Sequence, residues 1–357
     1  MSKFWSKRAH ELDPYTPGEQ PQDQQYIKLN TNENPYPPSP HAIKAMREAS
    51  GESMRLYPDP RAQSLKQAIA DYYSLDVSQI FVGNSSDEVL AHAFVALLKQ
   101  EKPLLFPDIS YSFYPAYCSL FDIEAKLIAL ADDFTIRVED YTKNGDSDKE
   151  KGGIIFPNPN APTGIVLPLE KIETILQANP NVVVVIDEAY IDFGAETAIP
   201  LIAKYPNLLV TQTYSKSRSL AGLRVGFAVG HPDLIVGLER VKNSFNSYPL
   251  DRAAIAGATA SINDKEHFAE VCQKIIATRE KTAAALKEMD FTVLPSKTNF
   301  VFAKPNRANA EELYLQLKEH GFLVRYFSAQ RISGFLRITI GTDEEMGKFL
   351  QKLSELT

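Results

Sequence analysis

A run of five β-branched residues, Val182–Ile186, constrains the fold of this chain more than any other segment. A continuous apolar run this short is typical of a strand covered on both faces, and such strands belong to parallel sheets with helices on either side. The segments 208–211 and 225–229 have similar runs. The middle of the chain therefore predicts a doubly wound, mostly parallel α/β domain.

The rest of the pattern predicts a second, smaller domain. Short strands are expected over 80–82, 103–106 and 153–156, with helices over 62–73 and after Gly83–Asp87, where apolar residues recur at helical spacing. After residue 251 the pattern changes to a long helix over 265–289, strands over 292–294, 300–303 and 336–340, and a helix over 310–320. This order is typical of an α+β domain.

A length of 357 residues suits two domains. We expect a polar, proline-bearing N-terminal arm over 1–28, a large domain over 29–250 and a small C-terminal domain over 251–357. The lysine-rich stretch 141–151 is predicted to be a solvated loop.

Composition excludes several classes of function. With 38 Lys and Arg against 45 Asp and Glu, the net charge of −7 argues against a nucleic-acid or anionic-membrane surface, although a local basic pocket remains compatible. Cys118 and Cys272 form no CxxC pair, which favours a reducing, cytoplasmic setting. The start MSKFWSKRAHELDPY lacks the apolar core of a secretory signal, and no stretch predicts a membrane span. The six histidines are scattered, so no metal site is expected.

Two polar features lie at predicted strand ends, where open α/β sheets bind ligands. Asp187 directly follows the β-branched run, and a carboxylate there needs a cation, an ion pair or a helix cap as partner. Lys216 lies in a loop of small residues that would let a planar cofactor approach, although a solvated loop lysine is the ordinary alternative. Arg224, eight positions later, has a guanidinium fork that suits phosphate.

The third feature is Gly83–Asp87 at an expected helix start. Backbone N–H groups at such a start form an anion site, although simple capping by Ser or Asp is the more common use. A lysine for a Schiff base, an aspartate for a pyridinium nitrogen and a phosphate cradle together meet the requirements of pyridoxal 5′-phosphate (PLP). The three features together indicate a PLP site much more specifically than any one of them does alone.

The chain resembles the fold-type I PLP aminotransferases and, within them, the histidinol-phosphate aminotransferases. The resemblance extends over nearly the whole length. The segments that carry it are LDPYTPGEQP (12–21), KLNTNENPYPPSP (28–40), LYPDP (56–60), VGNSSDEVL (82–90), NPNAPTG (158–164), VIDEAYIDF (185–193), TYSKSRSLAGLRVGFAVG (213–230), NSFNSYPLD (243–251) and FLRITIGT (335–342).

The resemblance implies roles for residues near the cofactor ring. Lys216 would carry the cofactor and move the proton during transfer, and Asp187 would keep the pyridinium nitrogen protonated. Tyr190 would bond the ring hydroxyl oxygen. Tyr111 would stack on the ring, although a core aromatic is an equal alternative. Many relatives have Asn directly before Pro-Thr-Gly, where this chain has Ala161; either Asn160 takes that role or Tyr190 acts alone.

Further residues would bind the phosphate and the substrate. The expected phosphate ligands are Ser85, Ser86, Thr213, Ser215 and Arg224, and Asp87 is also expected to belong to the cofactor site. Tyr57 would reach the phosphate from the other subunit, which implies a homodimer. Arg337 would bind a substrate anion, although strand alternation also allows an outward surface arginine. The weaker candidates for the substrate pocket are Arg325, Tyr15 and Asn34.

The resemblance also implies the reaction. The expected reaction is transamination between L-histidinol phosphate and 2-oxoglutarate, giving imidazole acetol phosphate and glutamate in histidine biosynthesis. The alternatives are an aromatic or broad-range aminotransferase, a threonine-phosphate decarboxylase on the same scaffold, and a PLP-fold regulator that has lost catalysis. No G-x-S-x-G, Walker A or G-x-G-x-x-G motif supports a hydrolase or a nucleotide-binding protein.

Overall fold

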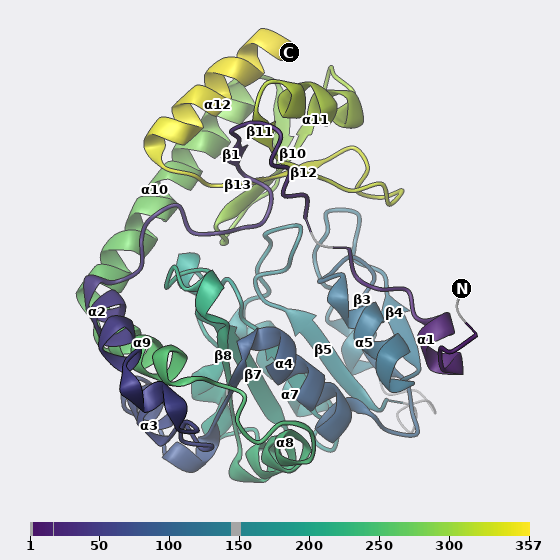
Figure 1. Cartoon of the computed structure of the whole chain (residues 1–357). Helices are drawn as coiled ribbons and strands as arrows, with labels where there is room; N and C mark the ends of the chain where they lie inside the picture. Colours follow the sequence, from purple (N-terminus) through teal and green to yellow (C-terminus); the bar gives the residue numbers. More distant parts are fainter. Residues whose placement is uncertain (1–2, 17, 144–150) are drawn as a thin grey trace.

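The computed structural model describes residues 3–16, 18–143 and 151–357. A large part built on a seven-stranded sheet lies below a smaller part that contains the C-terminus (Figure 1). The large sheet has the order β2-β8-β7-β6-β5-β3-β4. Its strands are β2 (Ile80–Asn84), β3 (Leu104–Pro107), β4 (Ala125–Ile128), β5 (Gly153–Pro157), β6 (Val184–Asp187), β7 (Leu208–Thr213) and β8 (Val225–Gly230).

The direction of the strands is mixed. The strands β4, β3, β5, β6 and β7 are mutually parallel, whereas β8 runs antiparallel to both β7 and β2. The predicted doubly wound, mostly parallel sheet is confirmed, with one antiparallel strand next to the edge that the apolar runs did not reveal.

Side chains alternate between the two faces of this sheet. Val184 and Ile186 belong to one buried cluster, and Val185 between them belongs to another. Because both faces are covered, a continuous apolar run is the expected sequence of such a strand. Helices α3 (Gln63–Tyr73), α7 (Leu169–Ala178) and α9 (Arg252–Asn263) contribute to the first cluster; α4 (Ser85–Ala93), α5 (Phe113–Phe121) and α8 (Pro232–Phe245) contribute to the second.

The smaller part has an antiparallel four-stranded sheet in the order β12-β13-β10-β9, with three helices packed on it. Its elements are β9 (Phe291–Val293), β10 (Phe300–Pro305), β12 (Arg325–Tyr326), β13 (Leu336–Thr339), α10 (Lys265–Glu288), α11 (Ala310–Glu319) and α12 (Asp343–Leu356). The long helix α10 runs along one side of the molecule and connects the two parts (Figure 1). The predicted smaller α+β unit has this architecture.

The N-terminal region extends over both parts. It comprises α1 (Lys7–Glu11), β1 (Ile27–Lys28) and α2 (Pro40–Ala49). Strand β1 pairs in parallel with β11 (Phe322–Leu323) of the smaller part, and Leu29 is buried in the C-terminal core. Helix α9 packs instead into the core of the large sheet. The boundaries at 28/29 and 250/251 stay a prediction.

One local prediction is wrong where the structure describes it. Tyr141, at the start of the expected solvated loop, lies in α6 (Glu139–Thr142) and is 1% exposed, because it packs into the first core cluster. Residues 144–150 of that stretch lie outside the described residues. Within the described ranges, every helix is too short or too polar to cross a bilayer.

Candidate active site

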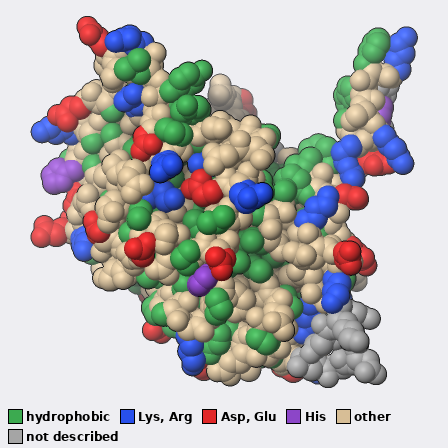
Figure 2. All heavy atoms as spheres, turned by 90° about the horizontal axis from the view of Figure 1, so that it is seen from below, with side chains coloured by type: hydrophobic (Ala, Val, Ile, Leu, Met, Phe, Trp, Pro, Cys, Tyr) green, Lys and Arg blue, Asp and Glu red, His purple; other side chains and the backbone are tan. Residues whose placement is uncertain are grey.

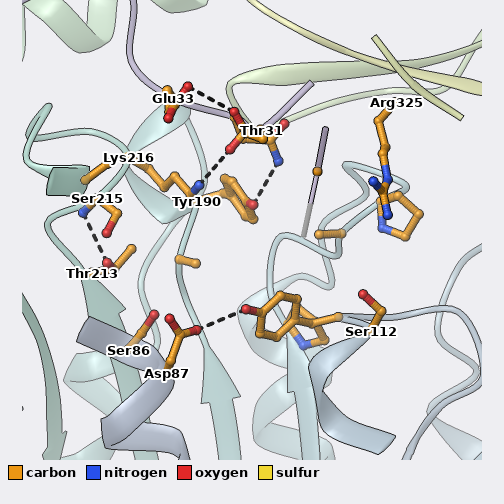
Figure 3. Close-up of a pocket in the computed structure, with 18 of the residues that line it drawn as sticks. Thr31, Glu33, Ser86, Asp87, Ser112, Tyr190, Thr213, Ser215, Lys216 and Arg325 are labelled. Carbon is orange, nitrogen blue, oxygen red and sulfur yellow. Dashed lines mark hydrogen bonds between the residues drawn. The ribbon is translucent and has the colours of Figure 1, made fainter. Parts of the chain in front are cut away.

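A cavity of about 420 Å³ lies between the strand ends of the large sheet and the smaller part. Figure 3 shows its lining, with Lys216 and Tyr190 on one side and Arg325 on the other. Most residues expected from the sequence line this cavity: Tyr15, Ser85, Ser86, Asp87, Tyr111, Asp187, Tyr190, Thr213, Ser215, Lys216, Arg224, Arg325 and Arg337. Segments far apart in the chain therefore converge on one site.

Lys216 lies three residues after the end of β7, which pairs with β8. Its Nζ atom donates a hydrogen bond of 3.1 Å to the backbone carbonyl of Thr31. Loss of hydration, reinforced by the positive charge of Arg337, lowers the pKa of the Lys216 amine to about 8. An amine with such a pKa is partly unprotonated near neutral pH, which makes it a competent nucleophile and base.

Asp187 is the last residue of β6 and is 4% exposed. Its carboxylate accepts hydrogen bonds from the Tyr114 hydroxyl at 3.0 Å, the Thr211 hydroxyl at 3.4 Å and the Ala189 N–H. None of these donors carries a charge, and burial raises the pKa of Asp187 to about 6. A cationic ring nitrogen in the cavity would supply the positive partner that a buried carboxylate requires.

The start of α4 and the start of β8 form one wall of the cavity. Ser85 has a positive φ of 67°, and its N–H donates to the Arg224 carbonyl at 2.8 Å. A Cβ atom on Gly226 would lie 2.2 Å from the Ser86 nitrogen, so only glycine allows this close approach. The geometry brings the helix N-terminus, the Ser215 loop and the Arg224 side chain to the same cavity.

Asp87 organises this wall through its carboxylate. It accepts hydrogen bonds from Arg224 at 2.7 Å, from the Tyr111 hydroxyl at 3.0 Å and from the Ser85 hydroxyl at 3.0 Å. Figure 3 shows the Asp87 bond to the tyrosine. An anionic acceptor repels phosphate, so the Asp87 side chain orients the guanidinium and hydroxyl donors around it. Tyr111 is thereby fixed at the cavity, with its ring stacked against Phe113.

The opposite wall is cationic. Arg337 donates to the Asn30 carbonyl at 2.7 Å, and its buried Nε atom has no hydrogen-bond partner. Arg325 is its cross-strand neighbour in β12, and Tyr15 packs on Phe113 at the rim. In the part of the chain that the structure describes, neither arginine forms an ion pair with a carboxylate. The alternative of an outward surface Arg337 is therefore wrong.

Three expected residues lie outside the lining. Asn160 is buried, and its Nδ2 atom donates to the Ile109 carbonyl and the Thr163 hydroxyl, whereas Ala161 lines the cavity. Asn34 donates to the backbone carbonyls of Lys216 at 3.0 Å and Ser217 at 3.2 Å, so it fixes the backbone of the loop that carries Lys216.

Tyr57 is the third. It is 77% exposed and stacks on Tyr248 at 4.7 Å between ring centroids, away from this chain's own cavity. This position is compatible with the expected reach into another subunit.

Sequence reasoning missed the contribution of residues 30–33. Thr31, Asn32 and Glu33 line the cavity, and Thr31 bonds Lys216 directly. Tyr114, the strongest donor to Asp187, was also missed. The polar block TNEN directly before the proline-rich segment 35–40 was the available signal, but its partners lie more than 150 positions away.

Comparisons with known proteins agree on the family. Residues 24–353 match the model of the family "Aminotransferase class I and II". The chain is 59% identical to histidinol-phosphate aminotransferase 1 of Pseudomonas fluorescens, covering 100% of both chains, and 57% identical to histidinol-phosphate aminotransferase 1 of Hydrogenovibrio crunogenus, covering 100% of this chain and 98% of the other.

A solved structure shares the fold. Histidinol-phosphate aminotransferase from Sinorhizobium meliloti, in complex with pyridoxal-5′-phosphate, superposes with a TM-score of 0.89 at 24% identity, over 100% of this chain and 98% of that one. The chain belongs to the class I and II aminotransferases and, among them, to the histidinol-phosphate aminotransferases.

Proposed function

We propose that this chain, with PLP as cofactor, transfers an amino group between L-histidinol phosphate and 2-oxoglutarate, giving imidazole acetol phosphate and glutamate, a step of histidine biosynthesis. One observation carries the proposal: Arg337 and Arg325 face Lys216 across the same cavity. Both amino donors, histidinol phosphate and glutamate, are anionic, and guanidinium groups suit phosphate and carboxylate alike. The names of the relatives at 57–59% identity support the same substrate.

The residues present fit the cofactor. Lys216 would hold PLP covalently, Asp187 would meet its ring nitrogen, and Ser85, Ser86, Thr213, Ser215 and Arg224 would surround its phosphate. The clearest indication that the site fits PLP is the buried carboxylate of Asp187, which has no cationic partner among the residues that the structure describes. The protonated ring nitrogen of PLP would pair with this charge, whereas a neutral ligand would leave it unpaired. When bound, PLP supplies a ring that withdraws electrons from the substrate carbon.

The protein then has three tasks. The amine of Lys216, with its lowered pKa, accepts the proton from the substrate carbon and returns it. Asp187 keeps the proton on the ring nitrogen through its negative charge. Arg337 holds the substrate anion, so that the reacting carbon lies close to the Lys216 amine.

We further propose a homodimer in which Tyr57 completes the site of the other subunit. Tyr57 and its stacking partner Tyr248 are both exposed in the single chain. The N-terminal segment with α1 projects from the body of the molecule (Figure 2), and it carries Phe4 at 85% and Trp5 at 52% exposure. Exposed aromatic side chains of this kind favour contact with a second copy.

We propose a cytoplasmic location as well. Cys118 and Cys272 are both buried as free thiols, which suits a reducing compartment.

The substrate is tested by measuring kcat/KM of the PLP-loaded enzyme for three amino donors: L-histidinol phosphate, phenylalanine and threonine phosphate. We expect histidinol phosphate to be preferred, with glutamate formed from 2-oxoglutarate. An aromatic aminotransferase would prefer phenylalanine, since it needs mainly an apolar pocket. A decarboxylase would release carbon dioxide from threonine phosphate and form no glutamate. Either result would overturn the substrate assignment and leave the cofactor assignment intact.

A further inference from the structure

Asn32 is buried at 1% exposure and has a positive φ of 56°, in the segment that crosses over the cavity. Its backbone carbonyl accepts from the Asn299 amide at 2.9 Å. Its side-chain Nδ2 atom donates to the Tyr190 hydroxyl at 2.9 Å. Asparagine tolerates this left-handed conformation better than most residues. Asn32 therefore connects the smaller part of the molecule to Tyr190, which lies beside Lys216 (Figure 3).

Thr339 determines which end of the Asn32 amide faces Tyr190. The Thr339 hydroxyl accepts from the Asn32 backbone N–H at 3.0 Å and donates its single proton to Asn32 Oδ1 at 3.0 Å. The amide oxygen is thus used by Thr339, and the amide nitrogen faces the phenol. The reverse orientation would leave the Thr339 proton without this acceptor.

The direction of the Tyr190 proton follows. The Nδ2 atom of Asn32 carries only protons, so the Tyr190 oxygen accepts this hydrogen bond. The phenol proton must then point elsewhere, and Tyr190 lines the cavity. With Asn32 behind it, Tyr190 is a hydrogen-bond donor toward the ligand.

The direction of the Tyr190 hydroxyl proton is especially important in this chain, because Asn160 does not donate to the cavity. Ala161 lines the cavity with a side chain that cannot form hydrogen bonds, and the Nδ2 atom of Asn160 donates to Ile109 and Thr163 instead of to the cavity. Tyr190 is therefore left to donate to the ring oxygen of bound PLP without help from Asn160. A tyrosine that could turn its proton toward an acceptor behind it would serve this role only part of the time.

We propose that Asn32 is a positioning residue: held by Thr339, it makes Tyr190 an acceptor on its outer side and so directs the Tyr190 proton to the ring oxygen of the cofactor. The inference rests on PLP as the cofactor but not on the identity of the amino donor. The charged groups that act on Tyr190 include Lys216, Arg337, Asp187 and Asp87. The variants below retain all of them, and Asn32→Asp adds one carboxylate, whose direct effect the double variant measures.

The first test reverses the hydrogen bond. Asn32→Asp has nearly the same shape but offers an acceptor to Tyr190, so the phenol proton turns away from the cofactor. A donor to the ring oxygen stabilises its anionic form, so losing the donor makes the chromophore hold its proton to higher pH. In the PLP-loaded protein we expect the midpoint of the visible absorbance titration to rise by roughly one pH unit, the size expected for one hydrogen bond.

The double variant separates positioning from general damage. In a Tyr190→Phe background, Asn32→Asp should shift the midpoint much less than it does in the wild type, because the hydroxyl through which it acts is gone. The dissociation constant of PLP, measured in the same samples, should show the same coupling. A shift of equal size in both backgrounds, or no shift in either, would overturn the proposal.

If Asn32→Asp does not fold, two uncharged substitutions at Thr339 test the proposal instead. Thr339→Val removes the hydroxyl that fixes the amide of Asn32, so the amide can turn and offer its oxygen to Tyr190. Thr339→Ser keeps the hydroxyl and is the matched control. We expect the midpoint to rise for Thr339→Val and to stay at the wild-type value for Thr339→Ser. Equal midpoints for the two variants would contradict the proposed role.

Discussion

The Nζ atom of Lys216 and the backbone carbonyl of Thr31 are joined by a hydrogen bond of 3.1 Å across 185 positions of sequence. Asn34, three residues further on, binds the backbone carbonyl of Lys216. The N-terminal segment therefore contacts the lysine at both its amine and its main chain. A backbone carbonyl is a neutral acceptor, so it orients the amine without adding the negative charge that would raise its pKa.

The pKa of Lys216 gives a testable pH dependence. Only the unprotonated amine can attack PLP, and its pKa is lowered from 10.5 to about 8. The rate at which PLP attaches to the apo-protein should therefore rise with pH through about 8 and level off above it. Stopped-flow absorbance over a range of pH measures this rate. A rate that keeps rising to pH 10 would show that the amine is not perturbed.

Arg337 provides the matched control for this prediction. Its positive charge is one cause of the lowered pKa, so Arg337→Gln should move the midpoint of attachment to higher pH. Arg337→Lys keeps the charge and should leave the midpoint near the wild-type value. The same midpoint in all three proteins would assign the lowered pKa to burial alone.

Asp187 should destabilise the apo-protein at neutral and higher pH. Its pKa is raised from 3.8 in the unfolded state to about 6 in the folded state. The folded state therefore binds this proton more tightly; the favourable contribution is complete below about pH 4 and is lost as pH rises through 6. Asp187→Asn should stabilise the apo-protein at pH 8 by up to about 3 kcal/mol, and by less as pH falls below 6.

Thermal unfolding of both apo-proteins at several pH values measures the difference. With PLP bound, the order should reverse, since the carboxylate then has a cationic partner that an amide cannot replace. Single-turnover transamination should also slow strongly in Asp187→Asn. A variant with an unchanged stability profile and near wild-type turnover would refute the assigned role.

The sequence predicted the parts of this molecule that depend on local pattern. The run 182–186 predicts a strand with two covered faces, and the alternation of Val184, Val185 and Ile186 between two cores is its direct consequence. An apolar run has no direction, however, so the antiparallel course of β8 could not be read from it. The location of Asp187 and Lys216 at neighbouring strand ends followed from topology.

Contacts over long separations were not predictable. Asn32 meets Tyr190 at a separation of 158 positions and Thr339 at 307, and only the folded chain brings them together. Tyr141 lies beside a charged stretch, yet tertiary packing buries it. Asn160 appeared available for the cofactor because its place in the sequence does not reveal that its Nδ2 atom donates to Thr163 and to Ile109, which is 51 positions away.

The close approach of β8 and α4 predicts a specific effect of Gly226. In Gly226→Ala the new methyl group would lie 2.2 Å from the Ser86 nitrogen and 2.4 Å from the Ser85 carbonyl carbon, so the start of α4 must move. Because that backbone lines the phosphate wall, we expect the dissociation constant of PLP to rise about ten-fold or more, a loss of at least ~1.4 kcal/mol. Fluorescence titration of the apo-protein with PLP measures it.

Gly347→Ala is the control for this substitution. Gly347 lies in α12, and an added Cβ meets nothing within 4 Å. Alanine in a helix interior should leave PLP binding unchanged and raise stability slightly. If Gly226→Ala bound PLP as tightly as Gly347→Ala, the close approach would have no part in the cofactor site.

A shared active site predicts that two damaged chains can restore each other. Lys216→Ala removes the lysine of its own site, and Tyr57→Phe removes the hydroxyl proposed to reach the other subunit's phosphate. A heterodimer of the two variants contains one site with both changes and one intact site. Mixed in equal amounts, unfolded and refolded, they should give about a quarter of wild-type activity in addition to the residual activity of the Tyr57→Phe homodimers, since half of the dimers are mixed and half of their sites are intact.

The assay should use limiting PLP, because loss of a phosphate contact affects cofactor retention most strongly there. Mixing Lys216→Ala with Arg224→Ala is the matched control. Both residues line the cavity of the same chain, so each site in that heterodimer carries one change and none is intact. Recovery in the first mixture and not in the second would establish that Tyr57 acts across the interface. Equal activity in the two mixtures, or full activity of Tyr57→Phe alone at limiting PLP, would show that each subunit works without its partner's tyrosine.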